Sequence, residues 1–309
     1  MSSPTGPDNG LPVRMPRPRQ PGRHRRPEPV VAPENAPALV LAVPGTPSGT
    51  HRGLAEETLS IARSELPGLD ARIGYVDGTD EEFPSLRTVL TQAAEERVAR
   101  AREAAAASEE AGPVADELPA VVVPLLAGPE AARMRQIRQA VLNSGSGAEL
   151  TDVLGPHPLL AEGVHVKLSE ASLARADRAR LFTVATAADG IVLATLGGEE
   201  AVQAAGITGM LLAARLAVPV LAAALDEEGG VPRVAEQLRG AGSRQLAIAP
   251  CLIGPEIPEG LLETAAREAG CATAEPLGTY PAVGKLVASA YAAKLGIGPQ
   301  SPQGARSTP

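Results

Sequence analysis

The sequence predicts an α/β protein made of two duplicated lobes, each with a parallel sheet flanked by helices. Short apolar, β-branched segments alternate with longer amphipathic ones along most of the chain, as in βαβ units. A length of 309 residues fits two ordinary domains better than one. The same order of elements also occurs twice. We therefore expect one lobe at about 38–170 and a second at about 180–297.

Each lobe is predicted from four strands and four helices. In the first lobe the strands are expected at Leu39–Val43, Ala71–Val76, Ala120–Pro124 and Leu150–Val153, and the helices at Gly53–Leu66, 85–110, Glu130–Leu142 and Pro158–Leu168. In the second lobe the strands are expected at Gly190–Thr195, Val218–Leu225, Gln245–Pro250 and Ala272–Glu275, and the helices at Glu199–Leu216, Val231–Arg239, Pro258–Ala269 and Pro281–Leu295.

Two short fragments at strand-to-helix junctions support the duplication. The sequence PLLAGPE at Pro124–Glu130 resembles PCLIGPE at Pro250–Glu256. In the same order, LGPHP at Leu154–Pro158 resembles LGTYP at Leu277–Pro281. Proline suits the first position of a helix, where its missing N–H costs nothing. Two matches in register indicate an internal repeat.

Three segments are expected to lie outside the two cores. Residues 1–37 are rich in proline and arginine, and we predict a disordered tail. Two alternatives stay open for this tail: a solvated extension, or a docking segment for an acidic protein partner. Residues 298–309 are predicted as a second tail. The Ala/Glu/Arg-rich stretch at 93–117 makes the first lobe longer and is expected to be a surface insertion.

Composition argues against several classes of partner. The formal net charge is -8, whereas a nucleic-acid surface needs clustered Lys and Arg. The longest apolar run, Met210–Leu225, contains a charge and a proline and is shorter than the ~20 residues of a membrane span. No apolar signal segment follows the first methionine, so we expect a cytoplasmic protein without nucleic-acid or membrane partners. Cys251 and Cys271 lack metal-site spacing and are predicted to be buried apolar residues.

The loops that follow the strands are the expected ligand site. In an open parallel sheet, ligands bind beyond the carboxyl ends of the strands. Gly45 and Gly49 in the first loop would allow close approach of a ligand, but the sequence has no glycine-rich phosphate-binding motif. We therefore expect no nucleotide. The sequence also lacks a nucleophile elbow and a zinc-protease helix motif.

The order of these motifs resembles that of the sirohydrochlorin and cobalt chelatases, the class II tetrapyrrole chelatases. The similarity rests on Pro124–Leu126 entering a glycine turn and on DVLGPHPL at Asp152–Leu159, and it spans about 39–295. It implies two flavodoxin-like lobes with the ligand cleft between them. It also implies insertion of Co²⁺ or Fe²⁺, as the metal substrate, into sirohydrochlorin or a related reduced, carboxylate-bearing tetrapyrrole. In the family, histidines at the mouth of the cleft hold the metal and accept pyrrole protons.

The chain departs from the family at both histidine positions. The family's Gly-His-Gly-Ser after the first strand corresponds here to Val43–Thr46, which puts Pro44 at the histidine position. Proline neither binds a metal ion nor takes a proton. The second family histidine falls in the region Glu130–Met134, which contains none. The equivalent first loop of the second repeat, Thr195–Gly198, has no histidine either.

Three residues are the remaining candidates for chemistry. Glu130 opens a helix after the third strand, where its carboxylate could bind a divalent ion. His157 and His51 lie in or just after strand-end loops and are candidate proton acceptors, with His157 also a candidate metal ligand. The alternative for Glu130 and its repeat counterpart Glu256 is that both only stabilise the turn at the start of a helix. Asp77 and Asp226, after the second strands, are interpreted as turn residues.

Backbone approach to the ligand is expected at four residues of the same loops: Gly45, Thr46, Gly128 and Gly155. Three functions remain open on the sequence alone. One is a chelatase that works with a reduced ligand set. Another is a catalytically degenerate protein that binds a tetrapyrrole or metal as a carrier, sensor or partner subunit. The third is an unrelated α/β protein that binds a small molecule.

Overall fold

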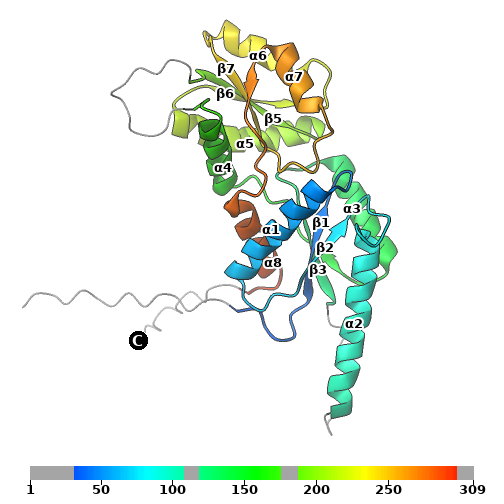
Figure 1. Ribbon diagram of the computed structural model, residues 1–309. Helices are drawn as coiled ribbons and strands as arrows, with labels where there is room; N and C mark the ends of the chain where they lie inside the picture. The colour runs from blue at the N-terminus through cyan, green and yellow to red at the C-terminus, as the bar shows by residue number, and fades with distance from the viewer. Residues whose placement is uncertain (1–30, 108–117, 175–186, 298–309) are drawn as a thin grey trace, which may run out of the picture.

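The computed structural model describes residues 31–107, 118–174 and 187–297 (Figure 1). Most of the predicted N-terminal tail, the whole C-terminal tail and residues 108–117 of the predicted insertion lie outside the described residues. The elements of the first repeat are β1 (Ala38–Val43), α1 (Gly49–Glu65), β2 (Ala71–Tyr75), α2 (Leu86–Ala107), β3 (Ala120–Pro124), α3 (Ala131–Ser144), β4 (Glu149–Leu150) and α4 (Pro158–Glu170).

The second repeat has the same sequence of elements. They are β5 (Gly190–Thr195), α5 (Gly198–Leu216), β6 (Val220–Ala224), α6 (Gly230–Gly240), β7 (Leu246–Pro250), α7 (Leu261–Ala269), β8 (Ala272–Thr273) and α8 (Pro281–Lys294). The strand orders are β2-β1-β3-β4 and β6-β5-β7-β8, and every pairing is parallel. The two orders are identical under the repeat, so the predicted fold class and duplication are confirmed.

The central strands carry the core of each lobe. Every residue of β1, β3, β5 and β7 is buried, as expected for parallel strands covered on both faces. The repeated prolines occupy equivalent places, since Pro124 lies opposite Ala42 and Pro250 lies opposite Ala194. The edge strands β4 and β8 pair over only two residues each, which is shorter than predicted.

One of the two helices on the shared face of each sheet comes from the other repeat. Helix α8, from the second repeat, packs against α1 and β3 of the first, while α4 packs against α5 and β7 of the second (Figure 1). One continuous apolar core, which includes Leu41 of β1 and Leu193 of β5, therefore runs through both lobes. The lobe boundaries at 38–170 and 180–297 remain a prediction. Helices α4 and α8 each pack on the sheet of the other repeat, so the two packed units do not follow these boundaries.

Helix α8 lies very close to α1 at Gly284. A Cβ atom at this position would lie 2.6 Å from the Cβ of Ile61 and 2.7 Å from the carbonyl oxygen of Thr58. Real Cβ atoms do not approach other atoms so closely, so the glycine allows this pair of helices to touch. The Tyr291 hydroxyl, farther along α8, donates a hydrogen bond to the Pro37 carbonyl and ties the helix to the entry of β1.

We expect Gly284→Ala to destabilise the protein by about 1–3 kcal/mol, because the added methyl group must push α8 away from α1. Gly53→Ala is the matched control: this helical glycine of α1 has no atom within 4 Å of its ideal Cβ position. Alanine there should be neutral or should stabilise by roughly 0.5–1 kcal/mol. Urea unfolding of both variants measures the difference. Equal midpoints would show that the α1–α8 contact tolerates separation.

Candidate functional site at the lobe junction

The loops beyond the strands of the two lobes meet each other directly. A Cβ atom on Gly45, after β1, would lie 1.9 Å from the carbonyl oxygen of Pro255, after β7. A Cβ atom on Gly197, after β5, would lie 2.7 Å from the carbonyl oxygen of Pro129, after β3. Gly45 and Gly197 have φ values of +80° and +112°, in the region that favours glycine. The two contacts are repeat equivalents, and together they hold the junction closed.

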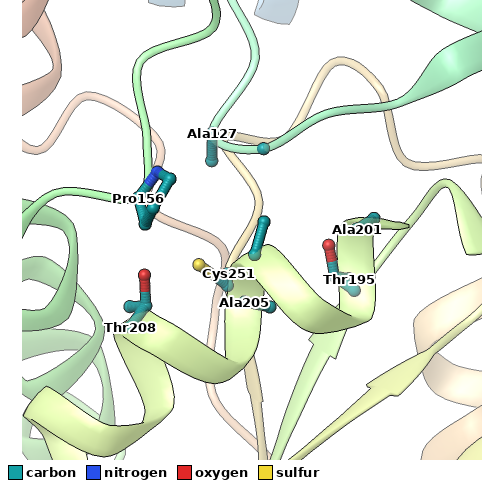
Figure 2. A pocket seen from close by; sticks show the side chains of 9 residues that line it. Ala127, Pro156, Thr195, Ala201, Ala205, Thr208 and Cys251 are labelled. Atoms are coloured by element: carbon teal, nitrogen blue, oxygen red, sulfur yellow. The ribbon is translucent and has the colours of Figure 1, made fainter. Parts of the chain in front are cut away.

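A small cavity lies at the lobe junction. Its volume is about 10 Å³, roughly that needed for one water molecule. It is lined by Ala127, Gly128, Pro156, Thr195, Ala201, Ala204, Ala205, Thr208 and Cys251. Figure 2 shows Pro156 and Ala127 facing Thr208 and Cys251 across this gap.

The two cysteines differ in their surroundings. Cys251 lies in the wall of the cavity and is buried, as predicted, and burial raises the pKa of its thiol to about 12. The thiol therefore stays protonated and unreactive at neutral pH. Cys271 is only partly buried and its sulfur lies beside Arg239, so the prediction of a fully buried residue was wrong for it.

Glu130, at the lobe junction, has a buried carboxyl group with an incomplete set of hydrogen bonds. It immediately precedes α3 and makes no side-chain capping bond, and its Oε2 is buried without a hydrogen-bond partner. Its Oε1 lies 3.6 Å from the Nε of Arg133. Burial raises the pKa of Glu130 to about 7; Arg133 opposes the shift, and the charges of Glu256 and Asp226 add to it. The carboxyl group therefore changes charge near neutral pH.

The repeat counterpart of Glu130 behaves differently. Glu256 is buried, and its two carboxylate oxygens accept hydrogen bonds from the backbone N–H groups of Ile253 and Gly254 at 2.6 and 2.8 Å. Both oxygens are thus used to hold the turn after β7. Burial raises the pKa of Glu256, and these backbone donors lower it. The turn role that the sequence left open fits Glu256, whereas Glu130 makes no such bonds.

The aspartates after the second strands also have partners. Asp77, after β2, accepts a hydrogen bond from the Arg133 guanidinium at 3.1 Å. Asp226, after β6, accepts from the backbone N–H of Gly197 through both oxygens, at 3.1 and 3.3 Å. Asp226 therefore ties the loop after β6 to the loop after β5. The sequence analysis missed Arg133, although its position one helical turn after Glu130 suggested a partner for that carboxylate.

His51 folds back onto the first loop. Ser48 caps α1 by accepting from the His51 backbone N–H, and the His51 ring Nδ1 lies 2.8 Å from the Thr46 carbonyl oxygen. Because a carbonyl oxygen only accepts hydrogen bonds, Nδ1 carries the proton, and the neutral ring keeps a free lone pair on Nε2. His51 therefore lies beside the loop that contains Pro44, and its role as a proton acceptor remains a prediction.

His157 has the opposite arrangement. Its Nδ1 accepts a hydrogen bond from the backbone N–H of Leu159 at 3.1 Å and caps the start of α4. The neutral ring then carries its proton on Nε2, and its one lone pair is occupied by the cap. Gly155 nearby leaves no room for a side chain, since a Cβ atom would lie 2.4 Å from the Ala127 carbonyl oxygen.

Four of the predicted site residues lie at or beside the lobe junction. Gly45 and Glu130 lie at the two interlobe contacts, Gly128 lines the cavity, and Gly155 packs against the loop after β3. In residues 31–107, 118–174 and 187–297, no group of three or more His, Cys, Asp or Glu side chains is placed to hold a metal ion. Glu130 and His157 as metal ligands remain a prediction.

The raised pKa of Glu130 gives a test by pH. A folded-state pKa of about 7, above the ordinary 4.5, means that folding favours the protonated carboxyl. Its contribution to stability is fully present below the unfolded pKa and is lost as the pH rises through about 7. We expect the melting temperature of Glu130→Gln, a mimic of the protonated form, to fall less between about pH 5 and about pH 8 than that of the native chain. Parallel melting curves would contradict the assignment.

Comparison with known proteins identifies the fold. No family model matches the chain, and no curated protein matches it by sequence. Solved structures do match: the chain has the two-lobed fold of the sirohydrochlorin chelatases, which confirms the resemblance at the level of the fold. No helix in the described part of the chain is long and apolar enough to cross a membrane.

Two solved structures show this similarity. One is CbiX, the terminal enzyme for biosynthesis of siroheme in denitrifying bacteria, with 16% identity, a TM-score of 0.50, and coverage of 84% of this chain and 99% of that one. The other is SirB from Bacillus subtilis with Fe³⁺, with 13% identity, a TM-score of 0.57, and coverage of 85% and 99%.

Proposed function

We propose that the chain is a sirohydrochlorin chelatase-like enzyme that inserts Co²⁺ or Fe²⁺ into a reduced, carboxylate-bearing tetrapyrrole between its lobes. The single observation that carries the proposal is Glu130. It stands in the region of the family's second histidine, its Oε2 is buried without a partner, and its pKa is about 7. A carboxyl group in this state exchanges protons at neutral pH much as an imidazole does.

The reaction needs two proton acceptors. When a divalent ion replaces the two N–H protons of the macrocycle, four metal–nitrogen bonds form and two protons leave. Glu130 takes one of these protons. His51 takes the other, because its Nε2 lone pair is free, whereas the lone pair of His157 caps α4. Pro44, at the position of the first family histidine, contributes only shape.

Binding of the macrocycle requires the junction to open. The cavity at the junction has a volume of about 10 Å³, far less than a tetrapyrrole occupies, so binding at this place requires the loops at Gly45 and Gly197 to separate. In the bound state the loops and the macrocycle together would keep water from Glu130 and from the reacting nitrogens.

A second candidate function is a binding protein that has lost catalysis. Pro44 favours it, as does the finding that no three-ligand metal group exists among the described side chains. Such a protein would bind sirohydrochlorin or a related tetrapyrrole as a carrier, sensor or partner subunit, and it would leave metal insertion at the uncatalysed rate.

An anaerobic titration with sirohydrochlorin, followed by addition of Co²⁺, separates these functions through the absorption spectrum of the macrocycle. We expect the native chain to bind the macrocycle and to speed insertion, and Glu130→Gln to bind it while insertion slows by about 100-fold or more. Glu259→Gln, a change at an exposed carboxylate, is the control and should leave the rate unchanged. Binding without any acceleration by the native chain would support the carrier, sensor or subunit function instead.

Histidine variants test the assignment of the second acceptor. His51→Ala should slow insertion strongly with little effect on stability. His157→Ala removes the cap of α4 and should lower stability by about 1 kcal/mol while most of the insertion rate remains. If the two variants behave in the reverse way, His157 is the proton acceptor.

Restoring the family histidine is a separate test. In a chain that also carries Glu130→Gln, Pro44→His should fail to restore insertion to the native rate, because both remaining acceptors would then lie at the first loop and none at the position of Glu130. Metal insertion rates of the double variant and the two single variants decide the question. Full recovery in the double variant would show that the first-loop histidine alone is sufficient.

A further inference from the structure

The outward face of α5 carries exposed apolar side chains that are not part of the core of the lobe. Ile207, Met210, Leu211 and Ala214 follow one another at helical spacing on the side opposite the sheet. Their larger members are 47%, 67% and 40% exposed. The first part of the long apolar run noted in the sequence thus lies on the surface. We call these four residues the α5 stripe.

The equivalent helix of the first repeat provides an internal comparison. The helices superpose through their buried faces, where α1 buries Ala55, Thr58, Leu59 and Ala62, and α5 buries Ala205, Thr208, Gly209 and Leu212. In this alignment Ile207, Met210 and Ala214 correspond to the exposed residues Glu57, Ser60 and Ser64, whereas Leu211 corresponds to Ile61, which packs against Gly284 of α8. Three of the four stripe positions are therefore polar in α1 and apolar in α5.

The charges around the α5 stripe indicate what covers it. Residues 201–214 carry no charged side chain, although the whole chain has a formal net charge of -8. Glu199 and Glu200 lie before this stretch, and Arg215 lies directly after it. The guanidinium of Arg215 lies 3.8 Å from the carboxylate of Glu162 in α4, but its side chain is still 44% exposed. The stripe is thus uncharged in its centre and oppositely charged at its two ends.

We propose that the α5 stripe is the interface of a homodimer, in which α5 of a second copy packs against it in the antiparallel direction. A two-fold pairing that brings Ile207 against Met210 of the copy places Arg215 within one helical turn of the copy's Glu199 and Glu200. Oppositely charged ends then meet at both edges of the interface, and the two helix dipoles lie antiparallel.

The α5 stripe lies close to the lobe junction. Four residues of α5 line the junction cavity, namely Ala201, Ala204, Ala205 and Thr208, and Ala204 lies one helical turn before Ile207. The dimer is inferred from the stripe and its flanking charges alone, so its failure would leave the proposed enzymatic function untouched. Stable dimers bury about 800 Å² per partner, more than one short stripe supplies, so we expect association that depends on protein concentration.

Sedimentation velocity of the full chain over a wide range of concentrations tests the proposal. We expect the native chain to dimerise reversibly, and Met210→Glu to raise the dimer dissociation constant by about tenfold or more, because it places a charge in the centre of the stripe. Ser60→Glu, the same change at the equivalent position of α1, is the control and should dimerise like the native chain. Melting temperatures show that each variant is folded.

Charge reversal tests the antiparallel direction. Arg215→Glu should weaken the dimer, and combining it with Glu199→Arg and Glu200→Arg should restore it. A chain that remains monomeric at every concentration overturns the proposal. A dimer that Met210→Glu leaves unchanged also overturns it, because the interface would then lie elsewhere.

Discussion

The exchange of the last helix between the repeats is the contact on which the rest of the structure depends. Each sheet is covered on one face by a helix from its own repeat and by a helix from the other. Because α4 and α8 cross over, the apolar core is shared, and neither lobe can bury its inner face alone. The same crossing fixes the carboxyl ends of both sheets toward one another, which creates the junction.

The closeness of that junction determines the chemistry of its side chains. Two glycines with positive φ allow the opposing loops to touch, and the touching loops exclude water from Glu130. Burial without a hydrogen-bonding partner for Oε2 then brings the pKa of Glu130 to about 7. Glu256 is buried more deeply, yet its backbone donors make it part of the turn. Glu130 and Glu256 are the same residue type at equivalent positions of the repeat, and they differ in the hydrogen bonds that their carboxylates accept.

The helices and strands were largely predictable from the sequence because the patterns that indicate them lie within short segments of the chain. Apolar runs, helix-opening prolines and the two repeated fragments located all sixteen described elements, with errors of a few residues at most boundaries. The exchange of α4 and α8 was not predictable, since periodicity shows that a helix has an apolar face without showing which sheet it covers. The glycines were expected to admit a ligand, whereas Gly45 admits the opposite loop. The protonation of His51 and His157 depends on hydrogen bonds that no spacing rule gives.

The crossed helices also bear on how such a chain arises from a single ancestral unit. One repeat by itself has a sheet with one face only partly covered and a terminal helix that packs on another sheet. Two copies of that unit would complete each other by swapping this helix around a two-fold axis, and the junction between the sheets would lie on the axis. In a fused chain the two halves are free to diverge. The two halves differ in this way at the junction, where Glu256 accepts hydrogen bonds that hold a turn and Glu130 does not.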